Sequence, residues 1–213
     1  MNSLSLKLIH PSTTMISGPT GCGKTQFVMK IIKQDMIQPK PERIQILYSE
    51  WQSAYDELQI LRPEIDFIRG FPPNFYDSLD PKVRNLVILD DQMSKVGDSK
   101  DLSRLFTEGS HHRNLSIIYI VQNLFDKGKS QRTVSLNTQY LVLFKNPRDK
   151  SQIEVLARQM YPKNTKFLVG SFLDATENPY GYLFLDLRPE TEEEFRVRTL
   201  IFPGDELVVY SPK

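Results

Sequence analysis

The segment Gly18-Pro-Thr-Gly-Cys-Gly-Lys-Thr25 matches G-x-x-x-x-G-K-[ST] at every fixed position. It follows a β-type run, Thr13–Ser17, and precedes a helical pattern from Thr25 to Met36. Glycines allow successive backbone N–H groups to turn toward phosphate oxygens, and the helix that follows presents its positive end to the same anion. The segment therefore predicts a phosphate-binding loop between a buried strand and a helix.

A loop of this type predicts a nucleotide site for ATP and Mg²⁺. Its lysine, here Lys24, reaches the β- and γ-phosphates, and its hydroxyl, here Thr25, coordinates the metal. Cys22 is interpreted as a small side chain that fits the turn. The predicted nucleotide contacts are Gly18, Pro19, Thr20, Gly21, Cys22, Gly23, Lys24, Thr25 and Gln26.

A pair of carboxylates follows a second buried strand. Four apolar residues, Leu86–Leu89, lead directly into Asp90 and Asp91. We expect Asp90 to hold Mg²⁺ through water, and Asp91 to orient or deprotonate the attacking water as a catalytic residue. Hydrolysing ATPases more often carry Glu at this second position, and Asp is one methylene shorter.

A polar pair, Gln122-Asn123, ends a third apolar strand, Ser116–Val121. We expect this strand to lie beside the one that ends at Asp90, so that its carboxyl end places Gln122 over the γ-phosphate. There the Gln122 amide can hydrogen-bond the attacking water or the phosphate, which makes it a candidate catalytic residue. Asn123 is open to two interpretations, a second sensor or a turn residue.

Alternating strands and helices predict the fold class. Further segments with strand or helix patterns are Ile44–Tyr48, Ala54–Leu61, Ile65–Ile68, Asp101–Glu108, Tyr140–Phe144, Ser151–Met160, Tyr182–Leu187 and Thr199–Phe202. The order predicts an α/β three-layer sandwich of the P-loop NTPase type, with a mostly parallel central sheet and helices on both faces. We expect a single domain over residues 1–213, with a core at about 10–165 and C-terminal strands and an acidic region at 166–213.

Composition limits the class of protein. Of the 213 residues, 39% are hydrophobic and 25% are charged, as in ordinary globular proteins, and no apolar run approaches the ~18 residues of a membrane span. One cysteine excludes an intramolecular disulfide and favours a reducing interior. Residues 127–166 hold nine basic and two acidic residues, a net +7, whereas residues 174–206 hold nine acids against three arginines, a net −6. The basic stretch is either a solvated surface or a track for a phosphate backbone.

These motifs together resemble the FtsK/HerA-like superfamily, and within it the viral genome-packaging ATPases of the poxvirus type and of Polinton-like elements. The resemblance rests on residues 18–25, on Leu86–Asp91, on Ser110-His-His-Arg-Asn-Leu-Ser-Ile-Ile-Tyr-Ile-Val-Gln-Asn123 and on Leu143-Phe-Lys-Asn-Pro-Arg-Asp-Lys-Ser151, within roughly Thr13 to Tyr161. The first two motifs are shared by many P-loop proteins, and the last two narrow the assignment. The bacterial chromosome translocases carry extra domains that these 213 residues do not include, so we expect a minimal motor.

The resemblance implies a motor that hydrolyses ATP to move double-stranded DNA into a capsid. Such motors are homo-oligomeric rings, are recruited by capsid or other virion proteins, and work inside the host cell, in the nucleus or a cytoplasmic virus factory, or with the virion. They are not secreted. In such rings an arginine of one subunit reaches the γ-phosphate of its neighbour and offsets transition-state charge. The candidates are Arg113, which we favour as the catalytic arginine, Arg132 and Arg148.

Two other functions fit the same loop. A P-loop nucleoside or nucleotide kinase is of similar size, and Arg132 and Arg148 would then belong to a lid over the phosphates. An ATP-dependent virion assembly factor without DNA translocation would instead bind capsid or membrane proteins, and the acidic run Thr191–Phe195 suits docking. Phosphate transfer to a nucleoside would indicate the kinase, and nucleotide-dependent protein binding without DNA stimulation would indicate the assembly factor.

Overall fold

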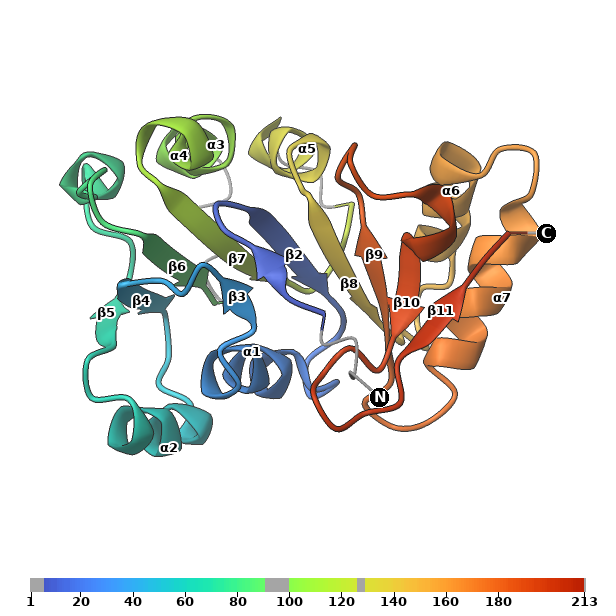
Figure 1. Cartoon of the computed structure of the whole chain (residues 1–213), viewed down its shortest axis with the longest axis horizontal. Coiled ribbons are helices and arrows are strands. Elements are labelled where there is room, and N and C mark those ends of the chain that lie inside the picture. Colours follow the sequence, from blue (N-terminus) through green and yellow to red (C-terminus); the bar gives the residue numbers. More distant parts are fainter. Residues whose placement is uncertain (1–5, 91–99, 126–128, 213) are drawn as a thin grey trace.

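A nine-stranded sheet runs through the molecule in the order β11-β10-β9-β8-β2-β7-β6-β4-β5 (Figure 1). The computed structural model describes residues 6–90, 100–125 and 129–212. Its strands are β2 (Thr13–Ser17), β4 (Arg43–Tyr48), β5 (Asp66–Arg69), β6 (Asn85–Leu89), β7 (Leu115–Val121), β8 (Tyr140–Phe144), β9 (Tyr182–Asp186), β10 (Val197–Thr199) and β11 (Val208–Tyr210). A separate parallel pair joins β1 (Leu8–Ile9) to β3 (Ile37–Gln38).

Six neighbouring strands, from β8 to β5, run parallel, and β9 to β11 continue the sheet in antiparallel fashion. In the parallel part Ser17 pairs with Val121, and Leu89 pairs with Tyr119. The carboxyl ends of β2, β7, β6 and β4 therefore meet at one edge of the sheet, which we call the loop edge. This is the edge at which ligands bind in open α/β sheets.

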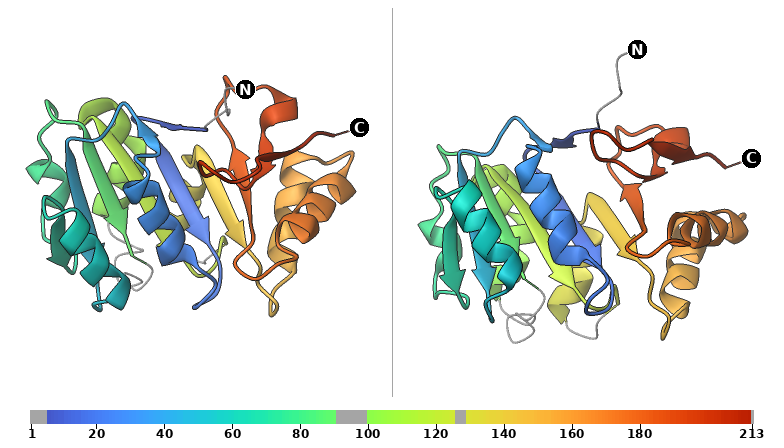
Figure 2. Two further views of the ribbon diagram at one scale, coloured as in Figure 1. Left: turned by 60° about the horizontal axis from the view of Figure 1, so that its bottom comes forward. Right: turned by 90° about the horizontal axis from the view of Figure 1, so that it is seen from below.

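Helices cover both faces of the sheet (Figures 1 and 2). One face carries α1 (Lys24–Lys33) and α2 (Ser53–Leu61), and the other carries α3 (Lys100–Thr107), α4 (Gly109–His112), α5 (Lys129–Leu136), α6 (Ser151–Met160) and α7 (Thr165–Ala175). Two short 3-10 helices lie at Phe75–Ser78 and Glu193–Phe195. None of the helices in the described part of the chain is long and apolar enough to cross a membrane.

Two apolar cores form because alternate strand residues point to opposite faces. On β7, Ile117 and Tyr119 join the core under α3, α6 and α7, whereas Ile118 and Ile120 join the core under α1 and α2. Every residue of β2, β6, β7, β8 and β9 is buried. This burial on both faces explains why these strands are continuous apolar runs and not alternating ones.

The fold class predicted from the sequence is confirmed: a mostly parallel α/β sheet between two helical layers. Two local predictions were wrong. The strand expected at Thr199–Phe202 ends at Thr199, because Leu200 turns the chain with a φ of 54° and Phe202 packs beside α1 instead. The first helix begins at Lys24 and ends at Lys33, before Asp35 at a φ of 47°. Helix α7 was not predicted, since its buried stripe is short.

Candidate functional site

The phosphate-binding loop lies at the centre of the loop edge, because β2 is flanked by β7 and β8. Two glycines of the loop are required by geometry. Gly23 has a φ of 106°, which side chains rarely adopt. A Cβ at Gly18 would lie 2.7 Å from Phe144 Cβ and 2.7 Å from Cys22 Sγ. Cys22 therefore fills the space beside Gly18 as a small packing side chain.

Lys24 is buried and folds back across the loop. Its Nζ donates to the carbonyl oxygen of Gly18 at 2.5 Å and to that of Pro19 at 3.0 Å. The first turn of α1 contains no acidic residue, so the positive end of the helix is not offset by a carboxylate of its own. The ammonium group and the helix end together make this loop attractive to a phosphate group.

Asp90 lies at the end of β6, fully buried, and its backbone N–H donates to Leu47 O at 3.0 Å. Its Oδ2 accepts two hydrogen bonds of 2.7 Å, from Gln52 Nε2 and from the Tyr55 hydroxyl. Thr25 Oγ1 donates to Gln52 Oε1 at 3.0 Å. One amide side chain thus connects the two residues that the sequence predicts as metal ligands.

Tyr55 is a neutral donor in this arrangement. Burial raises the pKa of its hydroxyl far above the ordinary value, and the Asp90 charge and hydrogen bond raise it further. Neither Gln52 nor Tyr55 was predicted from the sequence as a site residue. Both follow β4, and β4 is the neighbour of β6, so only the strand order brings them to Asp90.

Gln122 also reaches the site. As expected, its strand β7 lies beside β6, and it lies beside β2 as well. Gln122 is exposed at the loop edge, whereas Asn123 is tied to α6: its Oδ1 accepts from Gln152 Nε2 at 3.2 Å. Gln152 also accepts from the backbone N–H of Leu124 at 2.8 Å. Asn123 therefore serves the attachment of this loop to α6.

These groups surround one cavity of about 350 Å³. Its lining contains eight of the predicted site residues, namely Thr20, Gly21, Gly23, Lys24, Thr25, Gln26, Asp90 and Gln122. It also contains four residues that the sequence did not single out as site residues, namely Gln52, Ser53, Ala54 and Tyr180. The backbone of the loop, a lysine, a hydroxyl and a buried carboxylate therefore converge on a single polar space.

An aromatic cleft of about 400 Å³ adjoins this cavity and shares Gly23, Gln26 and Tyr180 with it. Its other lining residues are Phe27, Lys30, Phe144, Tyr182, Phe202 and Asp205. At its outer end Lys30 Nζ lies 4.3 Å above the Phe202 ring and 3.3 Å from Asp205 Oδ2. Tyr180 stands at the junction of the two spaces with 72% of its surface exposed and a φ of 64°.

The aromatic residues near β4 do not line this cleft. The Trp51 ring lies 5.3 Å from that of Tyr48 and 5.6 Å from that of Tyr55, and its Nε1 donates to Asp56 at 2.8 Å. These rings pack against one another and against Phe67.

Of the remaining predicted residues, Asp91 lies outside the described part of the chain. Arg113 precedes β7, at the edge of the sheet opposite the loop edge. Its guanidinium pairs with Asp77 at 3.3 Å, donates to Leu79 O at 3.4 Å and lies 5.0 Å from the Tyr76 ring centre. It is therefore not brought into the cavity of its own subunit. Arg132 on α5 and Arg148 after β8 are both exposed.

The donor set fits the Mg²⁺ ion that P-loop sites employ. Thr25 and Asp90 supply oxygen atoms, the ligands this ion prefers, and both converge on the same amide group of Gln52. The cavity is large enough for water molecules, several of which Mg²⁺ usually retains.

No protein-family model matches the sequence, and no curated protein does. Solved structures match by fold. The genome packaging NTPase B204 of Sulfolobus turreted icosahedral virus 2, in complex with sulfate, has 13% identity and a TM-score of 0.55 over 95% of this chain and 97% of that one. The cytoplasmic domain of the type VII secretion ATPase EccC of Thermomonospora curvata has 12% identity and a TM-score of 0.54, over 94% of this chain and 25% of that one. The flagellar accessory protein FlaH of Methanocaldococcus jannaschii has 10% identity and a TM-score of 0.50, over 95% of this chain and 90% of that one.

These similarities show the fold of P-loop ATPases. B204 was also solved with ATP-γS and with AMPPCP, at 11% and 12% identity to this chain. At such identities the similarity shows the fold alone, and the role of each side chain has to be argued from its own surroundings.

Proposed function

We propose that this protein is an ATP-hydrolysing motor that moves double-stranded viral DNA into a capsid. The observation that carries the nucleotide part is the convergence of Lys24, Thr25, Asp90 and Gln122 on one cavity beside a glycine loop. The packaging part rests on the motifs quoted above and on the fold shared with B204, which is described as a DNA-packaging ATPase.

The two adjoining spaces suit the two ends of ATP. The phosphates lie in the polar cavity, where Lys24 leaves its carbonyl partners and donates to phosphate oxygens instead. The base lies in the aromatic cleft, where the ring of Tyr180 stacks on it. The nearby carboxylate of Asp205 accepts from an exocyclic amine, which adenine provides.

Thr25 and Asp90 would hold Mg²⁺ between them, as the donor set indicates. The ion offsets the charge that develops on the phosphates during hydrolysis. Gln122, exposed at the loop edge, orients the attacking water. Asp91 follows directly on Asp90 in the chain and takes the role of the base.

DNA contacts are proposed for the loop between β8 and α6. Lys145, Arg148 and Lys150 are exposed there, at the loop edge, and form no ion pair with another described residue. Lys163 and Lys166 belong to the same basic stretch but lie elsewhere. They follow α6, whose ten residues span about 15 Å and separate them from the 145–150 loop. The stretch is therefore divided between two surfaces.

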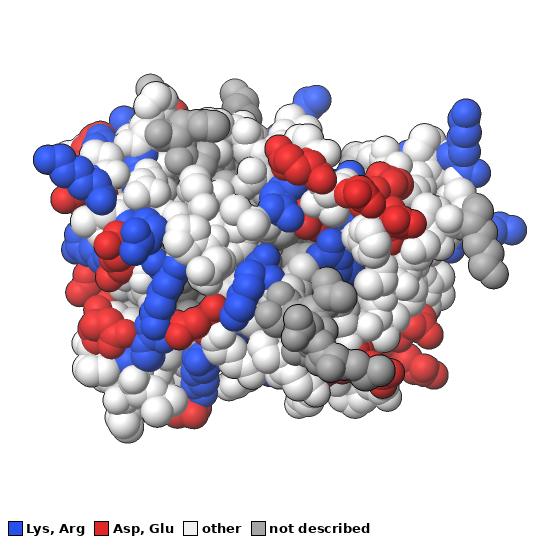
Figure 3. Space-filling view, viewed as in Figure 1, with Lys and Arg blue, Asp and Glu red and all other residues white. Residues whose placement is uncertain are grey.

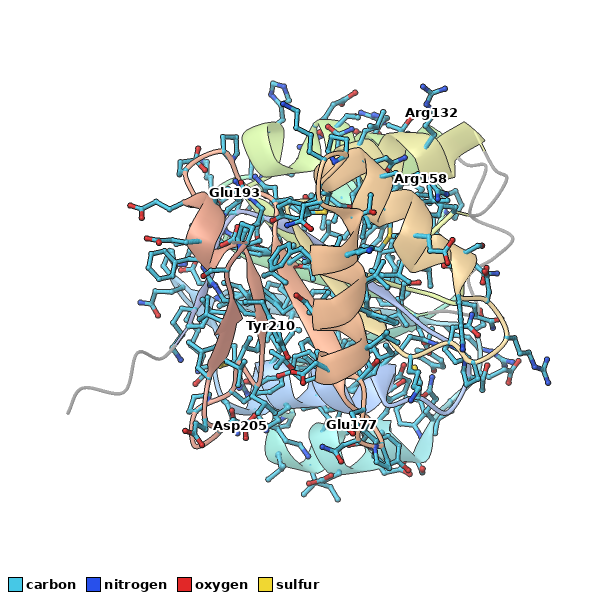
Figure 4. The ribbon with its side chains drawn as sticks, turned by 90° about the vertical axis from the view of Figure 1, so that its right-hand side faces the viewer. Arg132, Arg158, Glu177, Glu193, Asp205 and Tyr210 are labelled. Carbon is cyan, nitrogen blue, oxygen red and sulfur yellow. The ribbon has the colours of Figure 1, made fainter. Side chains whose placement is uncertain are left out.

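Figure 3 shows the charges on the face that Figure 1 presents, and Figure 4 shows the side that carries α6 and α7. In Figure 3, positive and negative side chains are interspersed on the face that is in view. In Figure 4, Arg132 and Arg158 project from α5 and α6, whereas Glu193 projects from the 3-10 helix before β10 and Asp205 from the loop between β10 and β11. We propose that a basic track for DNA forms when several subunits bring their 145–150 loops together in a ring.

In the ring, one subunit would also supply the arginine that reaches the γ-phosphate bound by its neighbour. Arg148 is exposed at the loop edge, and Arg132 is exposed on α5, whereas Arg113 would have to leave Asp77 to reach a neighbouring subunit. We expect recruitment by capsid or other virion proteins inside the host cell. A kinase, or an assembly factor that does not translocate DNA, remains the alternative to be tested.

The test is steady-state ATP hydrolysis with and without double-stranded DNA, at low and moderate salt, with Lys24→Ala as the blank. Stimulation by DNA that weakens with salt is expected for a motor that grips phosphates. Turnover that is indifferent to DNA, together with phosphate transfer to a nucleoside, would indicate the kinase. Nucleotide-dependent binding of capsid proteins without DNA stimulation would indicate the assembly factor.

A further inference from the structure

We propose that Gln52 is a latch that holds Thr25 and Asp90 together in the nucleotide-free protein and opens when the site is loaded with metal and nucleotide. The proposal rests on the proposed function, since it assigns a form of regulation to the same nucleotide site. It concerns a residue outside the phosphate loop and outside the strand that ends at Asp90.

The geometry of the amide is specific. Gln52 Oε1 accepts from the Thr25 hydroxyl at 3.0 Å, and Gln52 Nε2 donates to Asp90 Oδ2 at 2.7 Å. The reverse orientation of the amide would place its oxygen against the carboxylate, so the chemistry of the partners fixes the orientation. A bond to a buried carboxylate is also among the stronger hydrogen bonds in a protein.

The amide occupies the space between the two predicted metal ligands. A cation held by Thr25 that faces Asp90 Oδ2, directly or through water, would lie in this space. An N–H group that points at the carboxylate occupies the position where a cation or its water would face the same oxygen. For Thr25 Oγ1 and Asp90 Oδ2 to face one cation, the side chain of Gln52 must therefore turn away.

The latch is connected to α2, because Gln52 is the residue immediately before this helix. Its carbonyl oxygen accepts from the backbone N–H of Tyr55 at 2.9 Å, and Tyr55 makes the second bond to Asp90 Oδ2. Opening the latch therefore removes one of the two contacts between the start of α2 and Asp90. Trp51, the one tryptophan of the chain, precedes Gln52 and packs on Tyr55, so its fluorescence reports this change.

The experiment measures the dissociation constant of AMPPCP in Mg²⁺ and in EDTA by calorimetry, for the wild type, Gln52→Ala and Gln52→Glu. In the wild type, loading with metal has to break the Gln52–Asp90 hydrogen bond, whereas Gln52→Ala has no such bond to break. The ratio of the AMPPCP dissociation constant in EDTA to that in Mg²⁺ is therefore expected to be about tenfold larger in Gln52→Ala than in the wild type. This factor corresponds to one hydrogen bond to a charged group. Affinity in EDTA is expected to stay unchanged.

Gln52→Glu tests the same step with a side chain of equal length. It cannot donate to Asp90 and repels it, so we expect the preference for Mg²⁺ to rise at least as far as in Gln52→Ala. In the wild type, adding Mg²⁺ to the AMPPCP complex is expected to shift Trp51 emission, and this step is expected to be lost in Gln52→Ala. Gln59→Ala, an exposed glutamine of the same helix, is the matched control.

An unchanged ratio between the two buffers in both Gln52 variants would overturn the latch while leaving nucleotide binding intact. A fall in the ratio would overturn it as well, because Gln52 would then be a residue that supports the bound metal. If the wild type bound AMPPCP in neither buffer, the proposed nucleotide site itself would be refuted.

Discussion

The aromatic cleft makes a prediction about Tyr180 that separates base binding from phosphate binding. Tyr180 is 72% exposed at the junction of the cleft and the phosphate cavity. A base stacked on one face of its ring removes on the order of 50 Å² of the ring from water, about a quarter to a third of the area a tyrosine can bury. At 25 cal/mol per Å² this contributes about 1.3 kcal/mol.

The face of the base contributes a similar amount, which brings the stacking energy to about 2.5 kcal/mol. This lies within the range of about 1–3 kcal/mol measured when an aromatic residue that stacks on a base is replaced by alanine. We therefore expect Tyr180→Ala to weaken AMPPCP binding by about 60-fold. Tripolyphosphate, which has no base, should bind Tyr180→Ala and the wild type equally.

Calorimetry with the two ligands is the measurement, and the variants are chosen to separate stacking from damage to the loop. Tyr180 has a φ of 64°, a conformation that Phe and Tyr tolerate equally, so Tyr180→Phe removes only the hydroxyl and keeps the ring. This variant should bind AMPPCP within about twofold of the wild type. Phe195→Ala removes an exposed aromatic ring at the far edge of β9 and serves as the control. Equal losses for both ligands, or none for either, would refute the placement of the base.

Three further predictions concern catalysis, DNA and stability. Asp91→Asn should bind ATP as the wild type does but abolish turnover; normal hydrolysis would move the role of base to another residue. Alanine at the three basic positions of the 145–150 loop should lower the salt dependence of DNA binding by about three in log–log slope per subunit, while alanine at Lys163 and Lys166 should change it less. Finally, burial lowers the pKa of His10, whose Nδ1 lies 2.6 Å from Ser116 Oγ. Below its ordinary pKa of about 6.5 the unfolded chain binds the proton more readily, so the free energy of unfolding should fall as pH falls, by at most about 1.4 kcal/mol per pH unit. Urea unfolding between pH 7.5 and 5.5 measures this slope, and in His10→Gln it should be shallower.

The sequence predicted the loop and the layers of this fold because those features are local. A glycine pattern between a strand and a helix specifies its own geometry, and runs buried on both faces indicate parallel strands. It also predicted that the strand before Gln122 lies beside the one before Asp90. It did not predict the strand order, which places β4 next to β6 and so brings Gln52 and Tyr55 to Asp90. Nor did it predict the cleft, because Phe27, Tyr180 and Phe202 come from three distant segments.

The strands that end the chain therefore do more than extend the sheet. Because β9 pairs antiparallel with β8, its first residue, Tyr182, lies opposite Phe144 at the loop edge. The turn before β9 then carries Tyr180 to the mouth of the phosphate cavity, and the segment after β10 brings Phe202 against Phe27 of α1, with ring centres 4.9 Å apart. A core ending near residue 165 would keep the phosphate loop but lose the cleft. Specificity for the base would then depend on residues 166–213, and affinity for the phosphates on the loop that the sequence already identified.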